Sequence, residues 1–98
     1  MTTSIKQIPG KPASRGVFEL TIEGKRRGFL QYSLPDEGTI TLDYVEVSPE
    51  LNGKGYGAKL VGEAVKWARE QKRQVVPHCS FARAVMHRTK EFQDVLKD

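Results

Sequence analysis

Residues 45–57 read VEVSPELNGKGYG and join a strand of alternating valines to a helix through a glycine-rich loop. Gly53, Gly55 and Gly57 remove Cβ atoms from this loop and permit positive φ angles. Backbone N–H groups can then point into one concavity, and those at the end of the loop also belong to the unpaired donors of the helix that starts there. Together with the helix dipole and the cation of Lys54, these donors predict a cradle for a diphosphate.

Other phosphate-binding motifs fit this loop less well. A P-loop ends in Gly-Lys-Ser/Thr, and this loop does not. A dinucleotide fingerprint needs a βαβ unit and an acidic residue about 20 positions further on, and that position is not convincing here. A flexible connector rich in glycine is the remaining alternative.

Alternating hydrophobicity before the loop predicts three strands. Apolar residues occupy every second position over residues 18–22, 28–34 and 40–44, with turn residues between these runs. After the loop, the spacing of apolar residues from Leu60 to Ala68 is typical of a helix. The sequence then predicts a short strand over residues 74–77, a helix over residues 81–87 capped by Ser80, and a last helical turn over residues 91–96. The three hairpin-linked strands should be antiparallel, and the fourth, reached through a helix, should run parallel to the third.

The third strand contains a slip of phase. Ile40, Leu42 and Tyr44 are apolar at even positions, whereas Val45 and Val47 are apolar at odd positions. A slip of one residue turns the apolar set to the other face unless a bulge absorbs it. We therefore expect a β-bulge or a splayed strand near Tyr44–Val45, with a Val45 exposed or covered on both sides as the alternative.

The length and composition predict one small domain. The chain has 98 residues, of which 38% are hydrophobic and 29% charged, which argues against a disordered chain and against a membrane protein. Residues 1–15 lack periodicity and are expected to form a mobile tail, with a short strand possible near residues 5–8, before a single domain over residues 16–98. The absence of an apolar signal core and the single cysteine favour a cytoplasmic protein.

The charge is unevenly distributed along the chain. Residues 1–49 hold six basic and six acidic side chains, whereas residues 51–90 hold nine basic and two acidic ones. This excess indicates a polyanionic partner, such as a phosphate-bearing cofactor, nucleic acid or an anionic membrane surface. Charge alone does not choose among them.

Three segments together resemble a known family. Residues 45–57 are similar to the acetyl-CoA signature of the GNAT N-acetyltransferases, which reads Arg/Gln-x-x-Gly-x-Gly/Ala after a strand of alternating valines. The segments VVPHCSF at residues 75–81 and KEFQD at residues 90–94 resemble further marks of the short GNAT-like (YjdJ-type) N-acetyltransferase family. The resemblance spans residues 16–96. It implies an α+β protein with a truncated GNAT fold, in which a mixed, mostly antiparallel sheet of about four to five strands carries two to three helices.

The same resemblance implies a site for acetyl-CoA as cosubstrate. The molecule would lie in a V-shaped gap between the third and fourth strands, with its pantetheine amides against the backbone at Val45 and Val47. The residues implied for its pyrophosphate are Asn52, Gly53, Lys54, Gly55, Tyr56 and Gly57. Two positions depart from the family pattern, because Asn52 replaces the Arg or Gln of the signature and Lys90 replaces a Pro.

Cys79 is the candidate catalytic residue. It follows the fourth predicted strand and precedes a helix N-terminus, where the dipole favours a thiolate. The resemblance implies that it faces the acetyl group, either as a nucleophile or as the acid for the leaving thiolate, and a small buried hydrophobe is the alternative. Asp43 and Glu46 are weaker candidates for a general base, and His78 is a poor partner for Cys79 because neighbours in a strand point to opposite faces.

These observations favour an acetyl-CoA-dependent N-acetyltransferase that transfers an acetyl group to an amine, with Cys79 as a possible participant. The alternative is a non-catalytic module that binds acyl-CoA or a protein partner. Nucleic-acid binding ranks last, because the sequence lacks a recognised motif or an aromatic platform. No metal spacing and no membrane segment are present, the acceptor amine is not identified, and a monomer or weak homodimer is expected.

Overall fold

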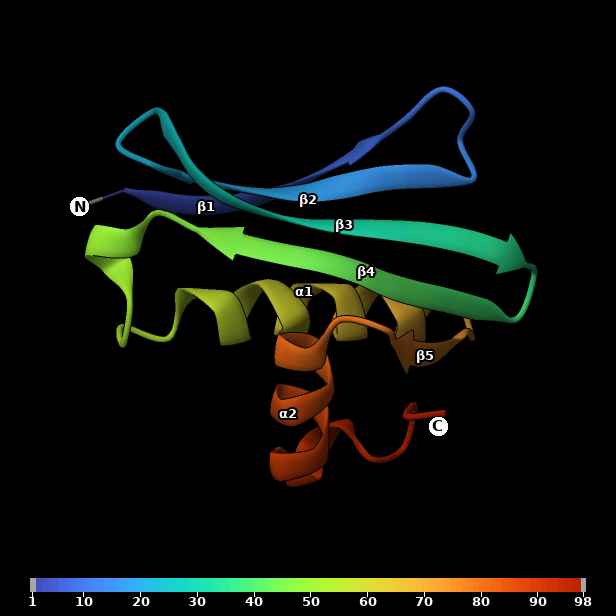
Figure 1. The fold of residues 1–98 in the computed structure, drawn as a ribbon. Helices are drawn as coiled ribbons and strands as arrows, with labels where there is room; N and C mark the ends of the chain where they lie inside the picture. Colours follow the sequence, from blue (N-terminus) through green and yellow to red (C-terminus); the bar gives the residue numbers. More distant parts are fainter. Residues whose placement is uncertain (1, 98) are drawn as a thin grey trace.

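The hairpins and the crossover form one mixed sheet in the computed structural model, which describes residues 2–97 (Figure 1). The strands lie in the order β1-β2-β3-β4-β5, antiparallel from β1 to β4, and β5 is parallel to β4 as expected. The bounds are β1 Thr3–Pro9, β2 Arg15–Ile22, β3 Lys25–Asp36, β4 Thr39–Val47, α1 Tyr56–Glu70, β5 Gln74–Pro77 and α2 Ser80–Arg88. Two short 3₁₀ helices span Pro49–Leu51 (η1) and Lys90–Phe92 (η2). The α+β class and the mixed sheet are therefore confirmed.

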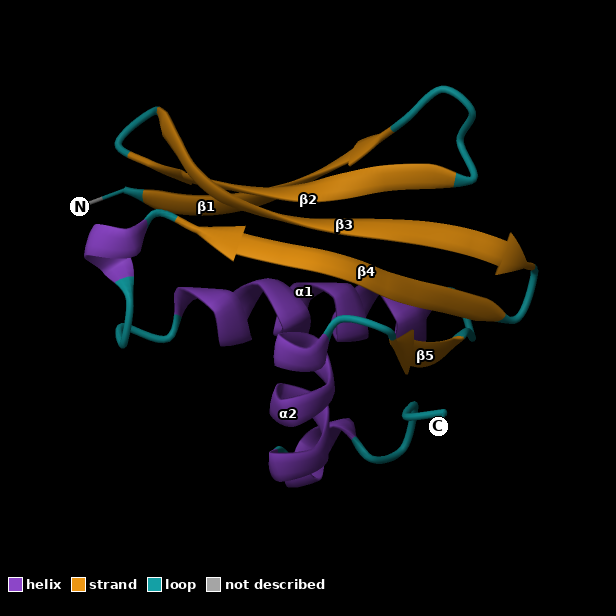
Figure 2. Cartoon of the chain, in the orientation of Figure 1, coloured by secondary structure: helices purple, strands orange, loops and turns teal. Residues whose placement is uncertain are grey.

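Both helices pack on the same face of the sheet (Figure 2). The apolar stripe of α1, from Leu60 to Ala68, is fully buried against alternate side chains of β2, β3 and β4. Ala82, Val85 and Met86 of α2 belong to the same core. Within residues 2–97 no helix covers the opposite face, which we call the open face.

The predicted bulge is present in β4. Gln31 pairs with Tyr44 but the next residue of β3 pairs with Leu42, so Asp43 is the extra residue. Leu42 faces the helices before the bulge, and Val45 and Val47 pack toward the same core after it. The bulge thus keeps both apolar sets on one face, one residue earlier than the position inferred from the change of phase.

The ends of the chain differ from the sequence-based expectation. Thr3–Pro9 form an edge strand paired along β2, which is longer than the short strand thought possible near residues 5–8 within a mobile tail over residues 1–15. Most side chains of β1 are exposed, so this strand lacks the alternation that reveals the others. Ser80 is the first residue of α2 rather than its cap, because Cys79 occupies the N-cap position. Beyond η2, Leu96 forms a parallel bridge with Val75 instead of continuing a helical turn.

Candidate functional site

A cavity opens where β4 and β5 separate. Their last pair joins Leu42 to Pro77, after which β4 continues to Val47 while the chain turns from β5 into α2. Beyond Leu42, every second residue of β4 therefore directs its N–H and C=O groups away from β3, where β5 offers no pair. The cavity has a volume of about 530 Å³, and it is lined by residues 45–47 of β4, residues 51–53 and 55–58, and two residues of α2.

The N-terminus of α1 opens into this cavity without a cap. The first intrahelical bond runs from the N–H of Lys59 to the carbonyl of Gly55, over 3.0 Å. The N–H groups of Tyr56, Gly57 and Ala58 precede this bond and have no acceptor within residues 2–97. The N-cap residue is Gly55, and no side chain of residues 2–97 accepts a capping hydrogen bond there. The three N–H groups are unpaired donors at the positive end of a 15-residue helix, which is the geometry that binds anions.

Glycine is required by the shape of the loop. Gly53 and Gly55 have φ angles of 79° and 84°, a region in which side chains other than glycine are strained. At Gly57 the constraint is space, because a Cβ atom would lie 2.6 Å from Cζ of Phe81. The three glycines therefore allow the backbone to line the cavity and allow α2 to approach α1.

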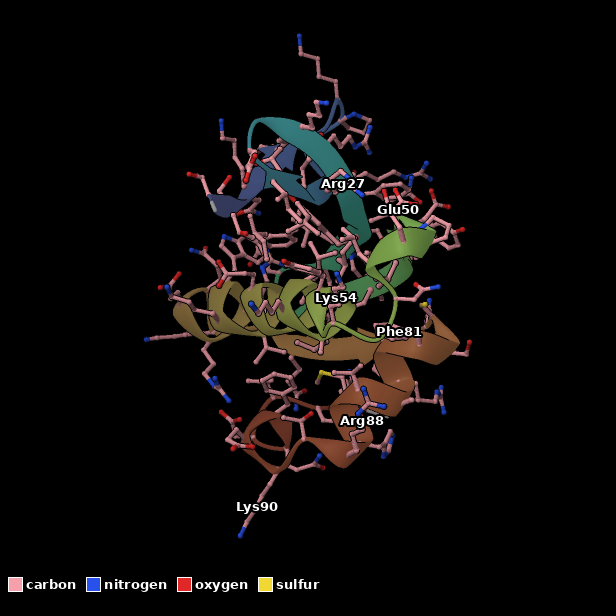
Figure 3. The ribbon with its side chains drawn as sticks, turned by 90° about the vertical axis from the view of Figure 1, so that its left-hand side faces the viewer. Arg27, Glu50, Lys54, Phe81, Arg88 and Lys90 are labelled. Carbon is pink, nitrogen blue, oxygen red and sulfur yellow. The ribbon has the colours of Figure 1, made fainter. Side chains whose placement is uncertain are left out.

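Two side chains of α2 complete the cavity, and sequence reasoning did not place either of them there. Phe81 lies over Gly57 with 40% of its surface exposed, and Arg88 reaches the cavity from the last turn of α2 (Figure 3). The Arg88 side chain has no ion pair or hydrogen bond within residues 2–97. Lys54 lies on the loop but is not a lining residue, and Lys90 points away (Figure 3). Arg88 therefore supplies a positive charge at the cavity itself.

The predicted cofactor residues converge on this cavity, with one exception. Val45, Val47, Asn52, Gly53, Gly55, Tyr56 and Gly57 all line it. The exception is Lys54, whose N–H donates to the carbonyl of Leu51 over 3.3 Å. The Lys59 Nζ atom lies 5.3 Å from the centroid of the Tyr56 ring. Tyr56 therefore both lines the cavity and contacts this cation.

Cys79 lies at the point where the two strands separate, but it does not line the main cavity. The carbonyl of Leu42 accepts the N–H of His78 over 3.0 Å and that of Cys79 over 3.1 Å. His78 approaches Asp43 with 3.9 Å between Nδ1 and Oδ1. The candidate residues Asp43 and Cys79 therefore lie with His78 around the backbone carbonyl of Leu42.

Tyr44 is a further polar group at this point. Its hydroxyl donates to Oε1 of Glu46 over 3.0 Å. This hydrogen bond raises the pKa of Tyr44 above its ordinary value, with smaller contributions from the charge of Glu46, from burial and from the charge of Cys79. The Tyr44 hydroxyl thus stays protonated at neutral pH. Glu46, one of the two candidate bases, already accepts the hydrogen bond from this hydroxyl.

The family model for GCN5-related N-acetyltransferases matches residues 17–95. The chain belongs to this family. No curated protein matches this chain. Membership of this family is consistent with a cavity formed by β4, the glycine-rich loop and α1.

Solved structures of GNAT proteins share the fold. A GCN5-like candidate N-acetyltransferase from Staphylococcus aureus is 30% identical, with a TM-score of 0.71 over 96% of this chain and 87% of that one. A GNAT family acetyltransferase from Elizabethkingia anophelis, solved with acetyl-CoA bound, is 13% identical, with a TM-score of 0.70 over 88% and 72%. An IAA acetyltransferase from Bacillus cereus is 18% identical, with a TM-score of 0.70 over 89% and 75%.

Within residues 2–97 no three His, Cys, Asp or Glu side chains gather closely enough to hold a metal ion. In the same residues no helix is long and apolar enough to cross a membrane.

Proposed function

We propose that this protein is an acetyl-CoA-dependent N-acetyltransferase that transfers an acetyl group to an amine. The observation that carries the proposal is the uncapped N-terminus of α1, which opens into a cavity beside the part of β4 that has no partner in β5. Open N–H donors and the Arg88 cation suit a diphosphate. The free backbone groups near Val45 and Val47 suit the amides of a pantetheine arm, which would lie beside β4 like an added strand.

Cys79 is proposed as the nucleophile. Its sulfur would attack the thioester carbonyl carbon, so that an S–C bond forms, the bond to the CoA sulfur breaks, and the thiol proton passes to that sulfur. Cys79 occupies the N-cap position of α2, at the point where β4 and β5 separate.

The test is mass spectrometry of the intact protein after incubation with acetyl-CoA. We expect a gain of one acetyl group on the wild type and none on Cys79→Ala. Transfer to an amine at an undiminished rate by Cys79→Ala would remove this residue from the mechanism while leaving the acetyltransferase proposal intact. Binding of acetyl-CoA without transfer to any amine would instead favour the non-catalytic alternative.

A further inference from the structure

A second, polar hollow of about 420 Å³ lies on the open face of the sheet. The residues that line it are Arg15, Gly16, Gln31, Tyr32, Ser33 and Asp43. Arg15 and Ser33 are paired across β2 and β3, at positions that alternate with the buried Tyr32. Asp43, as the bulged residue of β4, stands on the other side of the hollow. The hollow therefore spans three strands, with a cation at one side and a carboxylate at the other.

The groups on the Arg15 side of the hollow are available to a ligand. Within residues 2–97 the Arg15 guanidinium and the Gln31 amide have no hydrogen bond or ion pair. Ser33, in contrast, is hydrogen-bonded to the hydroxyl of Thr41. An unpaired guanidinium beside a second donor is well suited to a carboxylate, which it can bind through two parallel hydrogen bonds.

The carboxylate side of the hollow adjoins the place where β4 and β5 separate. Asp43 directly follows Leu42, whose carbonyl accepts the N–H groups of His78 and Cys79. Asp43 has 38% of its side chain exposed and faces His78 at 3.9 Å. An amine held by Asp43 would therefore lie at the gap between β4 and β5, across which the Cys79 side chain packs against the core. The cavity at α1 lies on that same helix side of β4.

We propose that this hollow is the acceptor site and that it takes a zwitterionic amine, namely a free α-amino acid. This inference rests on the proposed function. Arg15 and Gln31 would bind the carboxylate, and Asp43 would bind the ammonium group. The backbones of β2 and β4 are two strand spacings, or about 10 Å, apart. The side chains that extend between them leave room for a ligand whose two charged groups are separated by one carbon.

The transfer step follows from this placement. Asp43 accepts one proton from the ammonium group, and the resulting amine attacks the carbonyl carbon of the acetyl group on Cys79. An N–C bond forms, the bond between that carbon and the Cys79 sulfur breaks, and the second amine proton returns to the sulfur. The His78 ring, 62% exposed, stands beside Asp43 and can pass the first proton to solvent.

The experiment compares glycine, leucine and lysine with their α-amides, which keep the amine but lack the carboxylate. Each is titrated into ¹⁵N-labelled protein, and the backbone signals of Gln31, Ser33 and Asp43 are followed. We expect shifts with the free acids and not with the amides. Arg15→Gln should abolish these shifts and raise the KM for the acids about tenfold, with little change for the amides, because one charge-assisted contact is lost. Arg26→Gln is the matched control, since Arg26 pairs with Glu19 outside the hollow.

Three results would overturn the inference. They are equal shifts from acids and amides, an absence of shifts from all six compounds, and an equal loss of both substrate types in Arg15→Gln. If acetyl-CoA binds and the amides are acetylated as fast as the acids, the acceptor inference fails while the proposed function stands. If acetyl-CoA does not bind in calorimetry, both fail.

Discussion

Arg88 brings a guanidinium to the cavity from the last turn of α2, on which Arg83 is a second cation that does not line the cavity. We expect Arg88→Gln to raise the Kd for acetyl-CoA about tenfold, because the substitution removes one charge-assisted hydrogen bond. The loss should shrink at high salt, because exposed charges are screened. Calorimetry at two ionic strengths measures both effects. Arg83→Gln is the matched control, and an equal loss in both variants would mean that only net charge matters.

Gly55 occupies the left-handed region at the N-cap of α1. Gly55→Ala should lower the free energy of unfolding by about 1 kcal/mol, because a Cβ atom is strained at positive φ. If the loop keeps its shape, affinity for acetyl-CoA changes little. If it relaxes to negative φ, the donors turn away and affinity falls. Urea unfolding checks the first value, and unchanged stability would show that the loop does not need this conformation.

At the scale of elements, the Arg69–Asp94 ion pair fastens the C-terminal segment to α1. The guanidinium bonds both carboxylate oxygens of Asp94, at 2.9 and 2.7 Å, and also the carbonyl of Glu91. The hydrogen bond from Arg69 holds the pKa of Asp94 below its ordinary value of 3.8. A depressed pKa adds stability above pH 3.8 that is lost as the pH falls through the folded-state value.

We therefore expect Asp94→Asn to be less stable than the wild type at neutral pH, with a difference that narrows below about pH 4. Asp36, whose pKa is also lowered, chiefly by the N–H of Gly38, titrates in both proteins and cancels in the comparison. Thermal unfolding from pH 7 to pH 3 measures the difference. A gap that stays constant over this range would show that the ion pair contributes nothing to the acid dependence.

The elements that the sequence could predict are those with a local signal. The change of phase at Val45 located the bulge to within one residue, and the spacing after Gly57 located α1. The sequence allowed only a short strand near residues 5–8, and the full length of the edge strand β1 was not predicted because its exposed side chains carry no alternation. Phe81 and Arg88 were missed as cavity residues because their approach to the loop depends on how α2 packs against α1.

At the scale of the whole molecule, the basic second half does not form one anion-binding surface. Arg69 binds Asp94, and Arg73 donates to the carbonyls of Asp36 and Thr39, so both cations hold the fold together. Arg88, in contrast, has no partner within residues 2–97 and lines the cavity. Of the basic side chains over residues 51–90, Arg69 and Arg73 therefore make structural contacts, and Arg88 is a cation at the candidate site.

The most direct test of the central claim is titration calorimetry of the wild-type protein with acetyl-CoA. We expect binding of one molecule per chain, together with a rise in melting temperature. At a concentration one hundred times the Kd, binding adds about 2.7 kcal/mol of stability, which for a domain of this size is a shift of roughly 10–20 °C. No heat of binding and no shift at millimolar acetyl-CoA would contradict the account.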